Sequence, residues 1–243
     1  MFIPIGDDNS GRRITPYLVF GLIGLNALVW YLQLTAGEAF TYGFAAIPFE
    51  ITRGVDLVEA TVVNIGGRAF PVPQYPGPAP IHLTVLSSMF MHGGWMHILG
   101  NMLYLWIFGD QIEDLLGHFR FLAFYLICGA VATMAQILYQ PDSVIPTLGA
   151  SGAIAGVLGA YLIKYPRNPV RVLMFRYVMV MPAMVVLGFW IVLQVLSQVG
   201  TASGQASGVA YMAHIGGFVA GVILILLLGG PARKRRRAPT SFF

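Results

Sequence analysis

The sequence predicts an all-α polytopic membrane protein with six transmembrane helices and both termini in the cytoplasm. Of its 243 residues, 57% are hydrophobic and only 10% are charged, whereas about a quarter of the residues in a soluble domain are charged. The mean hydropathy of +0.73 is also too high for a soluble fold of this size to bury its apolar side chains. The third observation is the distribution of basic residues. With six spans, twelve of the fourteen Lys and Arg fall on the side of the termini, and such an excess marks the cytoplasmic side.

The first apolar segment covers residues 16–34 and carries no charge. At about 1.5 Å per residue it is long enough to cross roughly 30 Å of hydrocarbon. Residues 1–15 precede it as a short cytoplasmic N-terminus, and the membrane domain as a whole is expected at 16–230. The other five spans are expected at residues 83–108, 119–138, 148–163, 177–199 and 209–228.

The connections between the spans differ in character. Residues 35–81 form a long outer loop whose aromatic side chains predict packing at the membrane interface. Residues 109–120 and 164–176 are expected as cytoplasmic loops, and residues 200–208 as an outer loop that caps the site discussed below. The basic tail, 231–243, directly follows the last span, so we interpret it as a topology signal against an anionic leaflet rather than a nucleic-acid site. The expected location is the bacterial inner membrane.

Polar side chains inside apolar segments mark candidate functional positions, because a bilayer penalises them. Three sites qualify: His97 with Asn101, Ser151, and His214. Ser151 lies in the shortest segment, whose sixteen residues reach only about 24 Å. We therefore expect Ser151 at a helix N-terminus within the outer half of the bilayer, where unpaired backbone N–H groups gather.

Two pairs of glycines at GxxxG spacing border these polar residues. Such faces let helix backbones approach closely, and on their own they usually indicate packing only. The helix-packing pairs are Gly152 with Gly156 and Gly217 with Gly221. Because each pair adjoins either Ser151 or His214, packing of the two segments would bring the hydroxyl within reach of the imidazole, a suitable base for a serine nucleophile.

No acidic residue lies within an expected span, so any hydrolytic site here is a Ser–His dyad rather than a triad with a carboxylate. His97 and Asn101 are four residues apart and share one helix face. Together with the backbone N–H of Ser151 they are candidate donors to an oxyanion. For His97 alone, a structural hydrogen bond to a neighbouring helix is an equally good interpretation.

Three motifs together resemble the rhomboid intramembrane serine proteases. They are Gly149-Ala-Ser-Gly152, Ala213-His214 followed by glycines, and His97-x-x-x-Asn101. The resemblance implies that Ser151 is the nucleophile and His214 the general base, with His97, Asn101 and the Ser151 N–H forming the oxyanion hole. It also implies cleavage of transmembrane segments of other membrane proteins, without a cofactor.

The sequence departs from some members of that family in two places. The position four residues after the nucleophile is Ala155, where those members have an aromatic residue that stacks on the catalytic histidine. The outer loop also lacks their Trp-Arg pair. These departures remove no catalytic group but leave the support of His214 to be explained.

Other classes of function fit the sequence less well. A zinc site at His92, His97 and His214 would lack an HExxH motif and any acidic or cysteine cluster, and we expect His92 to be structural or interfacial. A transporter would show an inverted repeat or a charged midplane site. The main alternative is a non-catalytic rhomboid-like scaffold that binds transmembrane clients. The expected partners are transmembrane segments and membrane lipids, with neither nucleic acid nor metal.

Overall fold

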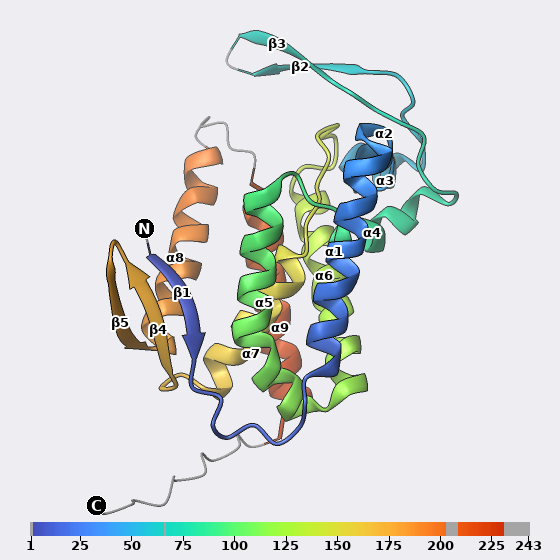
Figure 1. The fold of residues 1–243 in the computed structure, drawn as a ribbon. Helices are drawn as coiled ribbons and strands as arrows, with labels where there is room; N and C mark the ends of the chain where they lie inside the picture. Colours follow the sequence, from blue (N-terminus) through green and yellow to red (C-terminus); the bar gives the residue numbers. More distant parts are fainter. Residues whose placement is uncertain (1, 66, 203–208, 231–243) are drawn as a thin grey trace, which may run out of the picture.

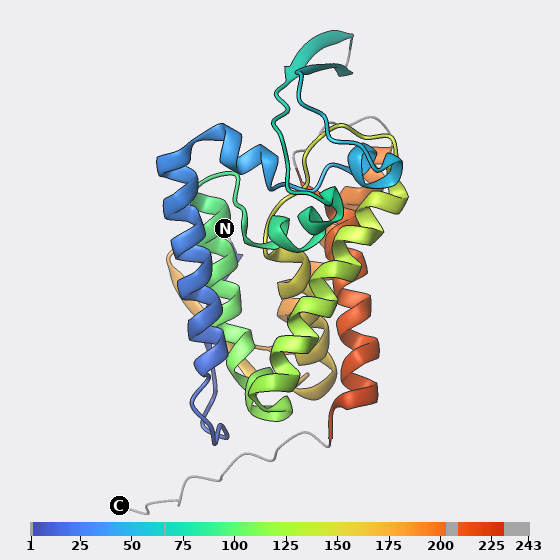
Figure 2. The ribbon, with the colours of Figure 1, turned by 90° about the vertical axis from the view of Figure 1, so that its right-hand side faces the viewer.

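The protein is mostly helical in a computed structural model that describes residues 2–65, 67–202 and 209–230 (Figure 1). The long helices run side by side and form a bundle in both views (Figures 1 and 2). They are α1 (Tyr17–Ala36), α5 (Trp95–Leu116), α6 (His118–Tyr139), α7 (Ser151–Lys164), α8 (Ala183–Ala202) and α9 (Tyr211–Leu228). The basic tail and residues 203–208 of the expected capping loop lie outside the described residues.

Four helices in the described part of the chain are long and apolar enough to cross a membrane, namely α1, α6, α8 and α9. Many of their outward side chains are apolar, as contact with lipid requires: Leu28 is 55% exposed, Leu138 72% and Leu227 76%. These features support the predicted helical membrane fold. The count of six spans stays a prediction, because α7 has only 14 residues and α5 ends in acidic residues.

The most buried helix is α7, which is packed against α5, α6 and α9. All residues from Gly152 to Tyr161 are buried. Its contact with α9 is made backbone to backbone, because a Cβ added at Gly217 would lie 2.0 Å from the carbonyl oxygen of Gly152. A Cβ at Gly221 would likewise lie 2.0 Å from the oxygen of Gly156. The small residues thus bring the N-terminal half of α7 against α9.

The second predicted span is wrong in its bounds. The chain first forms three short helical pieces, η1 (Ile81–Leu83), α4 (Thr84–Ser87) and η2 (Ser88–Phe90), and α5 begins only at Trp95. It then continues to Leu116 through the residues expected as a loop. Gly117, at φ 77°, makes the turn into α6.

Three carboxylates in the last turns of α5 therefore lie in a helix, although they were expected in the cytoplasmic loop 109–120. The N-terminal segment supplies hydrogen-bond donors to these three carboxylates. Asp110 accepts a hydrogen bond from the Arg12 guanidinium at 2.7 Å, and Asp114 accepts two from backbone N–H groups just before α1. Glu113 accepts from the N–H groups of Leu18 and Val19 in the first turn of α1, where the helix dipole favours a negative charge.

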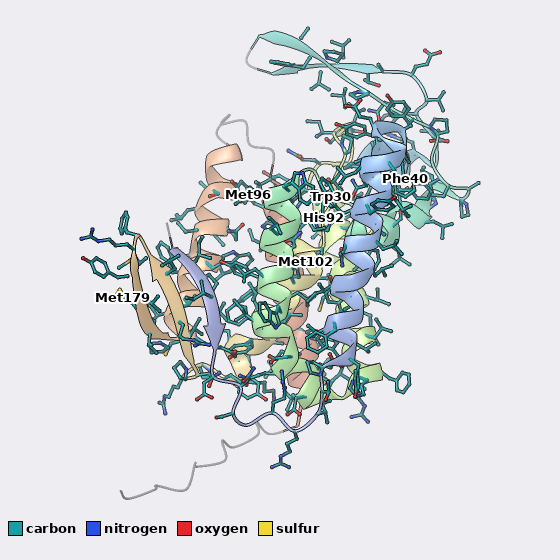
Figure 3. All side chains as sticks on the ribbon, viewed as in Figure 1. Trp30, Phe40, His92, Met96, Met102 and Met179 are labelled. Carbon is teal, nitrogen blue, oxygen red and sulfur yellow. The ribbon has the colours of Figure 1, made fainter. Side chains whose placement is uncertain are left out.

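The chain is not purely α-helical as predicted, because it also contains two small antiparallel sheets. The first has the order β1-β4-β5 and lies beside α8 (Figures 1 and 3). Its strands are β1 (Phe2–Asp7), β4 (Pro169–Met174) and β5 (Tyr177–Pro182). The fifth span was therefore predicted to begin too early, because residues 177–182 form β5 and α8 starts at Ala183.

The second sheet belongs to the outer connection, residues 35–81. It is a hairpin of β2 (Thr61–Ile65) and β3 (Arg68–Val72) that projects beyond the ends of the helices (Figures 1 and 2). The aromatic first half of the connection forms two short helices, α2 (Glu38–Gly43) and α3 (Pro48–Arg53). An isolated bridge between Ala46 and Thr147 joins this connection to the segment that leads into α7.

Candidate active site

Ser151 is the first residue of α7, as the sequence predicts. The segment before it is irregular, and a hydrogen bond to another part of the chain holds it in place. The N–H of Gly149 donates to the carbonyl of Ser88 at 2.8 Å. Gly149 has φ 126°, a conformation that residues with a side chain rarely adopt. This entry places the Ser151 hydroxyl inside the bundle at a helix N-terminus.

The Ser151 hydroxyl lies 2.8 Å from Nε2 of His214, a residue 63 positions later on α9. The two side chains come together because the glycine faces described above remove the space between their helices. The hydroxyl and the imidazole are therefore at hydrogen-bonding distance, which is the arrangement a serine nucleophile and its base require.

The other side of His214 contacts α8. Its Nδ1 lies 2.7 Å from Oε1 of Gln194. The Trp190 ring, one turn before Gln194 on α8, contacts the imidazole in a tilted arrangement with centroids 5.8 Å apart and planes at 39°. Tyr211 approaches the same ring edge-on at 6.5 Å. The aromatic neighbour that Ala155 does not supply thus comes from another helix.

Sequence reasoning missed both α8 residues. Neither Trp190 nor Gln194 was among the candidate site residues. A signal was present, since Gln194 is a polar residue inside an apolar segment, the criterion that selected Ser151 and His214.

His97 lies on α5, near the entry to α7. Its Nδ1 accepts a hydrogen bond from the N–H of Gly93 at 3.3 Å, so the neutral ring carries its proton on Nε2. That nitrogen lies against Gly149, where an added Cβ would be 2.7 Å away. The imidazole thus presents an N–H group beside the backbone that leads to Ser151.

Asn101, one turn further along α5, is buried and hydrogen bonded to His92. The distance from its Nδ2 to Nε2 of His92 is 2.9 Å. His92 has its Nδ1 against the carbonyl of Phe90 at 3.3 Å, so Nδ1 is the protonated nitrogen and Nε2 accepts from Asn101. The expectation that His92 is structural or interfacial stays a prediction, and these hydrogen bonds support the structural role.

His92 is in turn fixed by α1. The Gln33 side chain accepts from the His92 N–H and donates to the His92 carbonyl, both at 2.9 Å. A chain of hydrogen bonds therefore runs from Gln33 through His92 to Asn101, and it sets the direction of the Asn101 amide.

A cavity of about 820 Å³ joins these side chains. Ser151, His214, His97 and Asn101 all line it, and so do apolar or aromatic side chains such as Ile154 and Trp190. Of the described residues that line the cavity, none is acidic. The described residues also contain no group of three or more His, Cys, Asp or Glu placed to hold a metal ion.

Comparison with known proteins identifies the family of this chain. Residues 82–231 match the model of the Rhomboid domain, a stretch that contains α5 to α9 and the four candidate site residues His97, Asn101, Ser151 and His214. The chain belongs to the rhomboid family. A mostly helical rhomboid with several apolar helices is a membrane protein.

Several rhomboid relatives are similar over this region. The chain is 30% identical over 162 residues to Rhomboid protein 1, mitochondrial, of Saccharomyces cerevisiae, covering 64% of this chain and 44% of that protein. It is 31% identical over 147 residues to Rhomboid protease GluP of Bacillus subtilis, covering 60% and 26%. Rhomboid-like protein 11, chloroplastic, of Arabidopsis thaliana is 28% identical over 160 residues, covering 61% and 53%. The matched part is thus only about a quarter to a half of each of these relatives.

Proposed function

We propose that this rhomboid is an intramembrane serine endopeptidase that uses Ser151 as nucleophile and His214 as general base. The observation that supports this most directly is the 2.8 Å contact between the Ser151 hydroxyl and Nε2 of His214 inside a bundle of apolar helices. The name of the GluP relative, a rhomboid protease, agrees with it.

In the proposed reaction the Ser151 oxygen attacks the carbonyl carbon of a peptide bond while its proton passes to Nε2 of His214. The tetrahedral intermediate collapses as His214 gives that proton to the leaving amine, and an acyl-enzyme results. A water molecule then attacks the acyl carbon while His214 takes its proton. As the bond between the acyl carbon and the Ser151 oxygen breaks, His214 returns that proton to Ser151, and the carboxylic acid product leaves.

The negative charge on the carbonyl oxygen would be stabilised by three neutral donors. The first is the backbone N–H of Ser151, at the positive end of the α7 dipole. The second is the Nε2–H of His97. The third is the Asn101 amide, which has two N–H groups and uses one of them on His92.

The proposed substrates are transmembrane segments of other membrane proteins, which would reach the cavity from the lipid. In this topology all six long helices, including α5 and α7, count as spans and both termini are cytoplasmic. The 14 residues of α7 extend about 21 Å, so its N-terminus would lie below the outer membrane surface. We assign the protein to a bacterial inner membrane, although its relatives include mitochondrial and chloroplastic proteins.

The second candidate is a rhomboid-like scaffold that binds transmembrane clients without cutting them. The Ser151–His214 contact favours the enzyme, since a scaffold needs neither side chain nor their hydrogen bond.

The test is to label detergent-purified protein with a fluorophosphonate, a reagent that reacts with activated serines. We expect modification at Ser151 that is absent in Ser151→Ala and in His214→Ala, together with cleavage of a reconstituted transmembrane substrate by the wild type alone. A folded wild-type protein that neither reacts nor cleaves would support the scaffold instead.

A further inference from the structure

We propose that Gln194 is a positioning residue that holds His214 in its reactive tautomer and orientation. This inference rests on the proposed function, because it assigns the partner of the proposed base. The residue takes the place that a carboxylate occupies in a Ser-His-Asp triad.

The first step of the argument is the direction of the hydrogen bond. Oε1 of Gln194 lies 2.7 Å from Nδ1 of His214, and an amide oxygen can only accept. Nδ1 must therefore carry the proton. A neutral imidazole has one N–H group, so Nε2 is left with its lone pair toward the Ser151 hydroxyl, as a general base requires.

The second step is the orientation of the Gln194 amide itself. Its Nε2 lies 3.5 Å from the carbonyl oxygen of Trp190, one helical turn earlier. Rotating the amide by 180° would place two oxygen acceptors against each other and a donor against Nδ1, which would force the proton of His214 onto the nitrogen that faces Ser151. The α8 backbone thus favours the orientation that gives the reactive tautomer.

The third step is the placement of Trp190. Gln194 and Trp190 are four residues apart and lie on one face of α8. The tilted ring of Trp190 restricts movement of the imidazole out of its plane, and the Gln194 hydrogen bond fixes its rotation within that plane. Two residues of a single helix thereby determine the orientation of the His214 imidazole.

A neutral acceptor suits this position in a membrane. An isolated carboxylate among apolar helices is costly, and the described residues that line the cavity include no Lys or Arg to pair with it. An amide supplies the same hydrogen-bond acceptor without a charge.

The experiment compares Gln194→Met, which keeps the side-chain length but removes the acceptor, with Gln194→Glu, which restores an acceptor. For Gln194→Met we expect kcat for a transmembrane substrate to fall about tenfold, the loss expected for one hydrogen bond, with KM nearly unchanged. In Gln194→Glu the rate should recover, and the acid limb of its kcat–pH profile should move to higher pH because a carboxylate favours the imidazolium. The matched control is Val195→Met on the same helix, whose side chain is exposed; it should behave like the wild type.

A wild-type kcat and pH profile in folded Gln194→Met would overturn the positioning role, while labelling of Ser151 in the same sample would leave the proposed function intact. If Gln194→Met does not fold, the proposal is tested by the ¹⁵N resonances of the His214 ring in the wild type. These resonances are assigned by comparison with His214→Phe. A proton on Nδ1 supports the proposal, and a proton on Nε2 refutes it.

Discussion

At the scale of single residues, the site is built from neutral side chains whose hydrogen-bond directions are set by their neighbours. Gln33 fixes His92, and His92 fixes the amide of Asn101. Gln194 fixes His214 in the same way. Each group that would meet the substrate thus has a partner behind it, which reduces the reorganisation needed when charge develops.

The Asn101 amide gives the prediction at this scale. Asn101→Ala should lower kcat by about 10²- to 10³-fold, the usual effect of removing one oxyanion donor, with a smaller change in KM. His97→Ala should act in the same direction. The measurement is the rate of cleavage of a reconstituted transmembrane substrate. Unchanged rates in both variants would place the oxyanion elsewhere.

The residues that sequence alone could predict are those that stand out in their own segment. Ser151, His214 and the pair His97 and Asn101 were selected because they are polar in apolar surroundings, and the structure brings all four to one cavity. Gln194 stands out in its segment in the same way, but its contact with His214 was not predicted, because that contact depends on how α8 is rotated against α9. No glycine pattern or charge in the sequence reports that rotation.

At the scale of helices, the α7–α9 contact determines whether Ser151 and His214 can form the proposed dyad. The Gly217→Ala substitution adds one methyl group where the nearest backbone oxygen would be 2.0 Å away. We expect a loss of about 1–3 kcal/mol of stability from overpacking, measured as a lower thermal unfolding temperature in detergent.

Gly188→Ala on α8 is the matched control for that substitution. A Cβ at Gly188 would meet nothing within 4 Å, and alanine has the higher helix propensity. The control should be neutral or slightly stabilising. Equal effects of the two substitutions would contradict the argument that close backbone contact, rather than glycine itself, matters here.

Helix boundaries were predictable where apolar runs end at clear breaks, as at the start of α7. They were not predictable at the end of α5, because Asp110, Glu113 and Asp114 resemble a polar loop until the N-terminal segment is placed against them. The strands were missed for a related reason. Residues 177–182 are apolar and merge with α8 in the sequence, and only pairing with β4 distinguishes them.

At the scale of the whole molecule, the first residues of the chain connect elements that are far apart in sequence. The Asp7 carboxylate, at the end of β1, accepts hydrogen bonds from Gln111 on α5 at 2.7 Å, from the hydroxyl of Tyr161 on α7, and from Asn168 just before β4 at 3.3 Å. Tyr161 is ten residues from Ser151, which is about 15 Å along the helix. This junction therefore lies well away from the site and stabilises the other end of the bundle.

The titration of Asp7 gives a prediction that tests this junction. Burial, the largest cause, raises its pKa from 3.8 to about 6, and the neighbouring carboxylates Asp110 and Asp8 add to the shift. A raised pKa means that the folded state holds the proton more tightly than the unfolded state. The stabilisation from protonated Asp7 is therefore complete below about pH 4 and is lost as the pH rises through about 6.

The substitution Asp7→Asn removes this titration while keeping an oxygen acceptor and nearly the same shape. The unfolding temperature of the variant minus that of the wild type should therefore rise as the pH goes from 4 to 7, because only the wild type then buries a charge. Measuring both proteins in the same detergent and buffers cancels the contributions of all other groups. A difference that stays constant, or falls, over this range would show that Asp7 is not held in a desolvated junction.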